Sequence, residues 1–164
     1  MNSITLATAA LVAALSGCAT APSVARSDEI KIERGGCFGF CPVYRLEVDR
    51  NIVRFKGLRH TGLLGDTAKP ANAATVTAIK AQLAPYRPSA GSAVFACTDA
   101  SSDQATYTIT WENLGGGDRP SLTFDSGCQA AEARTLRAIL EAIPSRLNLE
   151  QESRQVTRPG AARG

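Results

Sequence analysis

One segment with strict two-residue alternation constrains the fold of this chain more than any other feature. Between Gln104 and Trp111, alanine, tyrosine, isoleucine and tryptophan alternate with glutamine and three threonines. Successive side chains of a strand point to opposite faces, so this pattern predicts a strand with one buried face and one polar face. Such strands are typical of antiparallel sheets that leave one face open to solvent.

The rest of the chain predicts an α+β fold around this strand. Alternating or apolar segments predict further strands at residues 29–33, 44–48, 53–55 and 122–124. Apolar residues at helical spacing predict two helices, the first beginning near Pro70 and ending before Pro85, the second ending at Pro144. Residues 57–69 show no periodicity and predict an irregular segment. The expected order is β-β-β-α-β-β-α, a mostly antiparallel sheet of about five strands with two helices on one face.

The first seventeen residues have the composition of an export signal. They contain no Asp, Glu, Lys or Arg, and their apolar stretch at 4–15 is too short to span a bilayer. The sequence Leu-Ser-Gly-Cys at residues 15–18 resembles the bacterial lipobox, whose cysteine receives a diacylglyceryl group before cleavage. The resemblance implies that the signal peptide 1–17 is removed and that Cys18 becomes an acylated first residue. Several fatty acyl chains, such as palmitate, would make membrane anchoring stable.

The predicted lipoprotein has three further parts. Residues 18–27 would form a lipidated tether, and Ala19 after the cysteine implies the outer membrane, with the chain facing the periplasm. Residues 28–144 are long enough for a single domain with one core. Residues 145–164 are polar, with four Arg against two Glu, and predict a disordered, mildly basic tail. Because the net charge of the whole chain is only +3, nucleic acid is not expected as a partner.

Four cysteines remain once Cys18 is lipidated. An even number in an exported chain favours disulfides, for which four cysteines allow three pairings. If the strands at 30–34 and 44–48 pair, Cys37 and Cys41 face each other across a short reversal. A turn near residue 115 likewise brings Cys97 and Cys128 to the same end of a second hairpin. We therefore predict the disulfides Cys37–Cys41 and Cys97–Cys128.

Other uses of these cysteines fit the spacing less well. Zinc sites with four cysteine ligands usually present two close-spaced pairs, whereas Cys97 and Cys128 are far apart in the sequence. A thioredoxin-type pair needs Cys-x-x-Cys at the start of a helix, and haem attachment needs a histidine where Pro42 follows Cys41. No metal or cofactor is expected.

The run Cys-Phe-Gly-Phe-Cys-Pro-Val-Tyr at residues 37–44 is the most specific motif in the chain. It resembles the opening of an uncharacterised family of bacterial lipoprotein and secreted domains, in which Cys-Phe-Gly-x-Cys-Pro-x-Tyr leads into a β-hairpin. A Gly-Cys pair before the last helix matches residues 127–128, and the similarity spans roughly residues 30–143. The chain departs from the family at residues 49–51, where Asp-Arg-Asn replaces an Asp-Gly turn. Because the family has no known function, the resemblance implies fold and location but no catalytic residue.

Few residues are candidates for a functional site. His60 is the only histidine and lies among basic residues without a predicted partner for acid–base catalysis. Three aspartates near the second disulfide could converge on a cation or act as acid and base, although turn and capping roles are commoner. These are Asp99, Asp103 and Asp125. Phe38 and Phe40, on a disulfide-closed loop, would suit a binding partner if exposed, or pack inward as core.

Two classes of function follow. The first is a non-enzymatic envelope module that binds or scaffolds a protein, glycan or lipid partner through its open sheet face or the Cys37–Cys41 loop. The second is a small periplasmic enzyme, either hydrolase-like or a thiol–disulfide enzyme with a labile disulfide. We favour the first class and assign no catalytic residue, because no nucleophile, base and orienting group occur together.

Overall fold

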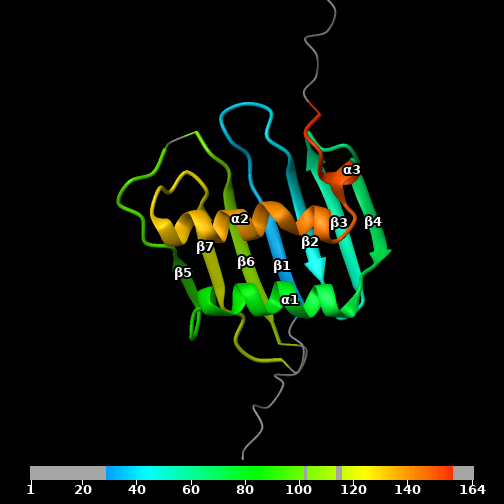
Figure 1. Cartoon of the computed structure of the whole chain (residues 1–164), viewed down its shortest axis with the longest axis horizontal. Coiled ribbons are helices and arrows are strands. Elements are labelled where there is room, and N and C mark those ends of the chain that lie inside the picture. Colours follow the sequence, from blue (N-terminus) through cyan, green and yellow to red (C-terminus); the bar gives the residue numbers. More distant parts are fainter. Residues whose placement is uncertain (1–28, 102, 114–115, 157–164) are drawn as a thin grey trace, which may run out of the picture.

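The computed structural model describes residues 29–156 except residues 102 and 114–115. The strands are β1 (Glu29–Arg34), β2 (Val43–Val48), β3 (Ile52–Arg59), β4 (Gly65–Pro70), β5 (Ser92–Val94), β6 (Thr106–Glu112) and β7 (Ser121–Asp125). The helices are α1 (Ala73–Leu83), the 3-10 turn η1 (Ala84–Tyr86), α2 (Ala131–Arg146) and α3 (Glu150–Ser153). All seven strands form one sheet in the order β4-β3-β2-β1-β6-β7-β5 (Figure 1).

The expectation of about five strands in the order β-β-β-α-β-β-α is wrong. The sheet has seven strands and is mixed, because β5 pairs parallel to β7. The two additional strands, β4 and β5, are the edges of the sheet, and α3 is a third α-helix. Every side chain of β4 is at least partly exposed, so this strand carries no alternating apolar pattern by which the sequence could reveal it.

The start of the first helix also differs from the expectation. Pro70 ends the edge strand β4, where an imino acid is tolerated, and does not lie in the first turn of α1. The helix begins at Ala73 because the side chain of Asn72 caps it, accepting hydrogen bonds from the backbone N–H groups of Ala74 and Thr75.

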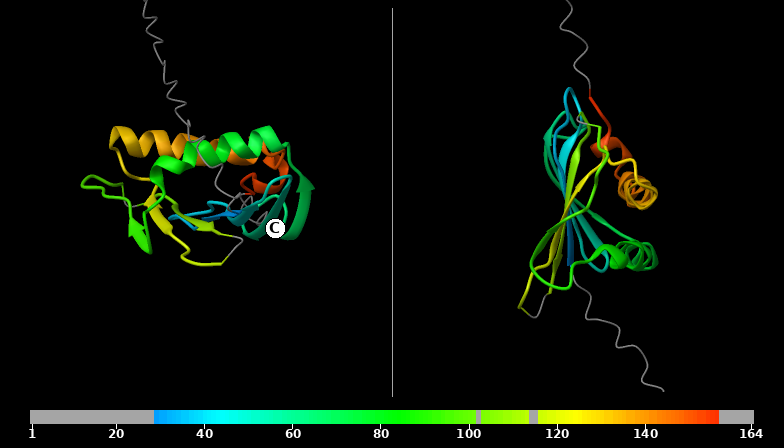
Figure 2. Two further views of the ribbon diagram at one scale, coloured as in Figure 1. Left: turned by 90° about the horizontal axis from the view of Figure 1, so that it is seen from below. Right: turned by 90° about the vertical axis from the view of Figure 1, so that its left-hand side faces the viewer.

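Helices α1 and α2 lie on the same face of the sheet and cover it (Figure 2). The register of β2, β1 and β6 aligns buried side chains from three strands in rows beneath these helices. The first row is Val48, Ile30 and Trp111, and the second is Leu46, Ile32 and Ile109. The uncovered face is polar: it carries the threonines of β6, as the alternation predicts, and charged side chains of β1 to β3.

The chain from 145 to 156 is part of the fold, so the expectation of a disordered tail beginning at residue 145 is wrong for this stretch. Helix α2 continues through Pro144, and Leu147 and Leu149 are buried. Two leucines among polar residues form too short a pattern to indicate a helix. Residues 157–164, like the predicted signal peptide and tether, lie outside the described residues. No helix in the described chain is long and apolar enough to cross a bilayer.

Candidate functional site

The structure pairs the cysteines as the hairpin geometry predicts. Cys37 is bonded to Cys41 with their Cα atoms 5.6 Å apart, and Cys97 to Cys128 with 5.9 Å between the Cα atoms. The first disulfide closes the connection between β1 and β2, which pair in the expected register. The second ties the segment before β6 to the turn after β7, and Cys128 is completely buried. The first disulfide therefore closes a short reversal, and the second holds a much longer connection at the sheet, with its cysteines 31 positions apart in the sequence.

The loop closed by the first disulfide, Cys37–Cys41, is called the aromatic loop below. The side chain of Phe38 is 89 % exposed and that of Phe40 is 50 % exposed, so neither is a core residue. Gly39 has a φ of 129°, a conformation that favours glycine and lets the loop turn back within a few residues. The alternative that these aromatic rings pack inward is thereby excluded for Phe38.

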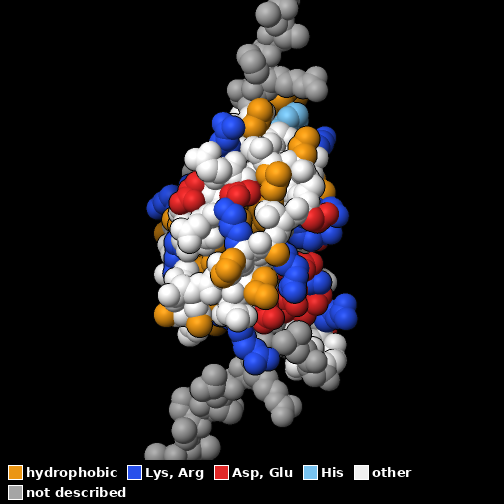
Figure 3. All heavy atoms as spheres, turned by 90° about the vertical axis from the view of Figure 1, so that its right-hand side faces the viewer, with side chains coloured by type: hydrophobic (Ala, Val, Ile, Leu, Met, Phe, Trp, Pro, Cys, Tyr) orange, Lys and Arg blue, Asp and Glu red, His pale blue; other side chains and the backbone are white. Residues whose placement is uncertain are grey.

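His60 lies beside the aromatic loop. Its ring packs edge-on against Phe40, with 5.2 Å between the ring centroids, and its carbonyl oxygen accepts a hydrogen bond from the N–H of Val156. Figure 3 shows hydrophobic side chains next to the histidine near the upper end of the molecule. His60 thus supports the aromatic loop and has no acid–base partner among the described residues.

The three candidate aspartates do not form a ligand set. No group of three or more His, Cys, Asp or Glu residues in the described chain is placed to hold a metal ion. Asp125 accepts a hydrogen bond from the N–H of Gly127 at 2.8 Å, and the carbonyl of Asp99 accepts one from the N–H of Gln129 at 3.0 Å. Both residues therefore stabilise the turn around the second disulfide.

A cluster that sequence reasoning missed lies below the aromatic loop. The register of the three central strands places Tyr44, Arg34 and Tyr107 side by side on the helix-covered face, as a third row above the two apolar ones. Arg34 lies on the same face of β1 as the buried residues Ile30 and Ile32, four and two positions earlier in the strand. An arginine in the apolar phase of an alternating strand is the sequence signal that could have revealed this site.

The side chain of Arg34 is fixed by two neighbours. Its Nε donates a hydrogen bond to the hydroxyl of Tyr107 at 3.0 Å, and its Nη1 donates to the carbonyl of Pro42, directly after the aromatic loop. The guanidinium carbon is 5.8 Å from the centroid of the Tyr107 ring. In the part of the chain that the structure describes, no carboxylate forms an ion pair with Arg34. A guanidinium has five N–H donors, so several remain available to a ligand.

Both tyrosines of this row stay protonated at neutral pH. Burial raises the pKa of Tyr44 and of Tyr107 above the ordinary value of 10.0. For Tyr44 the neighbouring Tyr107 hydroxyl adds to the rise, whereas the charge of Arg34 opposes it for both residues. The carboxylate of Glu141 also raises both pKa values. The two hydroxyls are therefore neutral, and they interact with each other as well as with Arg34.

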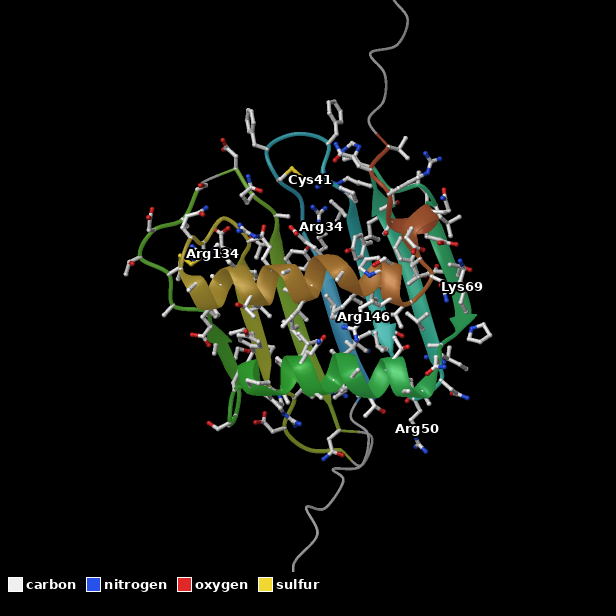
Figure 4. All side chains as sticks on the ribbon, in the orientation of Figure 1. Arg34, Cys41, Arg50, Lys69, Arg134 and Arg146 are labelled. Carbon is white, nitrogen blue, oxygen red and sulfur yellow. A yellow bond between two sulfur atoms is a disulfide. The ribbon has the colours of Figure 1, made fainter. Side chains whose placement is uncertain are left out.

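These residues line a cavity of about 370 Å³, called the arginine–tyrosine cleft below. Arg34, Tyr44 and Tyr107 come from the sheet, Glu141 comes from α2, and Glu150 begins α3. Figure 4 shows Arg34 directly beneath Cys41 and the aromatic loop. A volume of this size is at the lower end of the range of about 300–1,000 Å³ found for small-molecule sites. The cleft is thus large enough for a compact polar ligand.

Comparison with protein families identifies the domain. The family model described as a domain of unknown function (DUF6438) matches residues 28–144. The chain belongs to the DUF6438 family. Its domain thus has no assigned function, as the sequence resemblance implies. Comparisons with curated proteins and with solved structures gave no match.

The family match divides the arginine–tyrosine cleft into two parts. Arg34, Tyr44, Tyr107 and Glu141 lie inside the matched DUF6438 domain, together with the whole aromatic loop. Glu150 and the other cleft residues of the C-terminal segment 145–156 lie beyond the match. Part of the lining of the cleft therefore comes from residues that lie outside the DUF6438 match.

A second hollow, of about 390 Å³, lies on the uncovered face of the DUF6438 domain over β2, β3 and β4. Four of the five charged side chains among the described residues that line it are paired across strands: Arg45 pairs with Glu33 at 2.8 Å, Lys56 with Asp66 at 3.3 Å, and Glu47 with Lys31 at 3.6 Å. Exposed pairs of this kind are typical of a solvated sheet surface. The arginine–tyrosine cleft, with its half-buried guanidinium, is the stronger candidate site.

Proposed function

We propose that this protein is an envelope lipoprotein, anchored by lipid on Cys18, that acts by binding a partner protein through the aromatic loop and not by turnover. The observation that carries the proposal is the 89 % exposure of Phe38 on a loop of five residues closed by a disulfide. Phe38 shares this loop with Phe40, which is 50 % exposed, and exposed apolar side chains that gather at one place mark interaction sites. The loop is convex, so its natural complement is an apolar pocket on a protein.

The aromatic loop is held rigid before any partner binds. The disulfide Cys37–Cys41 fixes its two ends, and the hydrogen bond from Arg34 to the carbonyl of Pro42 fixes the exit. Phe40 is further restrained by its ring contact with His60. A pre-organised loop loses little conformational entropy on binding, so its aromatic side chains can contribute most of their burial free energy to affinity.

The direction of the chain supports a role away from the anchoring membrane. Strand β1 begins at Glu29 at one end of the sheet and leads directly to the aromatic loop at the other end (Figure 1). A lipid anchor on Cys18 precedes Glu29 in the sequence, so it would attach to the end opposite the aromatic loop. This arrangement favours a partner in the periplasmic space over the anchoring bilayer itself.

The test uses site-specific photo-crosslinking in the native host. A photoreactive amino acid at position 38 should crosslink a distinct partner, whereas the same amino acid at Val94 should not, although that side chain is 78 % exposed on the edge strand β5. We expect Phe40→Ala to reduce the crosslink from position 38 by about tenfold, the effect of removing a central aromatic contact. Replacing Cys37 and Cys41 by serine should reduce it as well.

Equal crosslinking from positions 38 and 94 would contradict the proposal, because it would mean that the aromatic loop is not a preferred contact. A crosslink to glycan in place of protein would reject a protein partner. Circular dichroism and thermal unfolding of each variant check that the fold is retained, as the exposure of Phe38 and Phe40 predicts.

A further inference from the structure

The arginine–tyrosine cleft carries an arrangement of charges that the aromatic loop does not explain. We propose that it binds a zwitterionic ligand, an amino acid or peptide end that carries a carboxylate and an ammonium group. The carboxylate would pair with Arg34, and the ammonium group with Glu141 and Glu150. This inference goes beyond the proposed function and does not rest on it.

The sheet wall of the cleft is suited to an anion. Arg34 is half-buried, is held by Tyr107 and Pro42, and has no carboxylate partner in the described residues. Tyr44 and Tyr107 are its partners on the two neighbouring strands, and both tyrosines are protonated and carry no charge. A fixed guanidinium that keeps several N–H donors unused is well placed for charge-assisted hydrogen bonds to a carboxylate.

The helix wall of the same cleft is suited to a cation. Glu141 on α2 and Glu150 at the start of α3 both line it and are exposed, and within the described chain neither forms an ion pair. Glu141 is close enough to the two tyrosines to raise the pKa of both. Arg34 is the only cationic side chain among the described residues that line this cavity. The lining thus holds one cation against two carboxylates.

This combination of charges selects the ligand class. A dicarboxylate would be attracted by Arg34 but repelled by Glu141 and Glu150. A diamine would be attracted by the two glutamates but repelled by Arg34. A ligand with both groups satisfies both walls. The volume of about 370 Å³ accommodates an amino acid or the end of a peptide, but not a folded partner.

The experiment is calorimetric titration of the full-length protein, with both disulfides intact, using three probes on matched carbon chains. These are 2,6-diaminopimelic acid, pimelic acid, which lacks the amines, and 1,5-diaminopentane, which lacks the carboxylates. We expect diaminopimelic acid to bind about tenfold or more tightly than either matched probe. The ligand could be a free amino acid or the end of a peptide. Comparing the affinity for free diaminopimelic acid with that for a peptide that ends in diaminopimelic acid distinguishes the two.

Variants of both walls complete the test. Glu141→Gln changes an exposed side chain, so it should fold normally and weaken the binding of diaminopimelic acid about tenfold. Arg34→Lys keeps the charge but loses the planar donor arrangement, and it should weaken binding as well. Phe38→Ala with Phe40→Ala should leave this affinity unchanged, which separates the cleft from the aromatic loop.

The proposal is overturned if pimelic acid or diaminopentane binds as tightly as diaminopimelic acid, since the cleft would then recognise one charge only. It is also overturned if none of the three probes binds, or if Glu141→Gln has the affinity of the unmodified protein.

Discussion

At the scale of single residues, the most informative position is Arg34. It occupies the inward phase of a strand whose preceding inward residues, Ile30 and Ile32, are almost completely buried. A polar group at such a position destabilises a fold unless it is hydrogen-bonded. The hydroxyl of Tyr107 and the carbonyl of Pro42 supply those bonds, so a charged residue is accommodated at the upper edge of the core.

The raised pKa values of Tyr44 and Tyr107 predict a dependence of stability on alkaline pH. The folded state keeps these protons where the unfolded chain, with tyrosine pKa near 10.0, loses them. The contribution of this difference to the free energy of unfolding is fully present below about pH 10. The contribution is lost as the pH rises toward the pKa values of the two tyrosines in the folded state. We expect the free energy of unfolding of Tyr107→Phe to fall less steeply between about pH 10 and 11 than that of the unmodified protein.

Urea unfolding at a series of alkaline pH values measures this difference. Tyr86→Phe is the comparison: burial raises the pKa of this residue as well, but it is less buried than Tyr107, so we expect a smaller change of slope. Identical pH slopes for the unmodified protein and for Tyr107→Phe would show that Tyr107 ionises normally in the folded state.

At the scale of elements, the C-terminal segment 145–156 packs against β3 and β4. Lys69 of β4 pairs with Glu152 of α3 at 2.6 Å and donates a second hydrogen bond to the carbonyl of Asn148 at 2.9 Å. The hydrogen bond from Lys69 holds the pKa of Glu152 below its usual range. Beneath these contacts Leu149 is completely buried. The segment is thus an integral layer of the fold.

This packing predicts a large difference between two leucine substitutions. Leu149→Ala should lower the free energy of unfolding by about 2–4 kcal/mol, because it leaves a cavity under α3. Leu64→Ala removes the same atoms from a side chain that is 66 % exposed and should cost only about 0.5 kcal/mol. Chemical denaturation of both variants checks the prediction. Similar small losses in the two variants would mean that the segment 145–156 is not packed on the domain.

At the scale of the whole molecule, the two ends of the sheet have different roles in the proposed function. In that proposal the anchor would precede the end where β1 begins at Glu29, whereas the aromatic loop and the arginine–tyrosine cleft lie at the other end of the sheet. Two candidate sites at one end and the anchor at the other would leave both sites accessible to periplasmic ligands.

The anchor itself gives a direct prediction. Mass spectrometry of the membrane-extracted protein should show a chain that begins at an acylated Cys18. Cys18→Ser should move the protein from the membrane fraction to the soluble fraction, because it loses the thiol that carries the lipid. Replacing Cys37 and Cys41 by serine is the control and should leave the protein in the membrane fraction. An unmodified chain that starts at Met1 as the main soluble product would refute lipidation.

Much of the central sheet could be predicted from sequence because its patterns are local. The alternation between Gln104 and Trp111 indicates β6 and the polar face of its threonines, and the short reversal between β1 and β2 sets their register. That register in turn places Cys37 opposite Cys41. Periodicity and short connections depend only on neighbouring residues, so they can be recognised without the fold.

The edge strands and the candidate cleft were decided by tertiary structure alone. Strands β4 and β5 bury too little apolar surface to show a pattern, and the parallel pairing of β5 with β7 depends on where α1 returns the chain. The row of Tyr44, Arg34 and Tyr107 joins three strands, and β1 and β6 are separated by more than 70 residues in the sequence. Which side chains become neighbours across strands depends on the register of distant segments, which is set by the packing of the whole core and not by any local pattern.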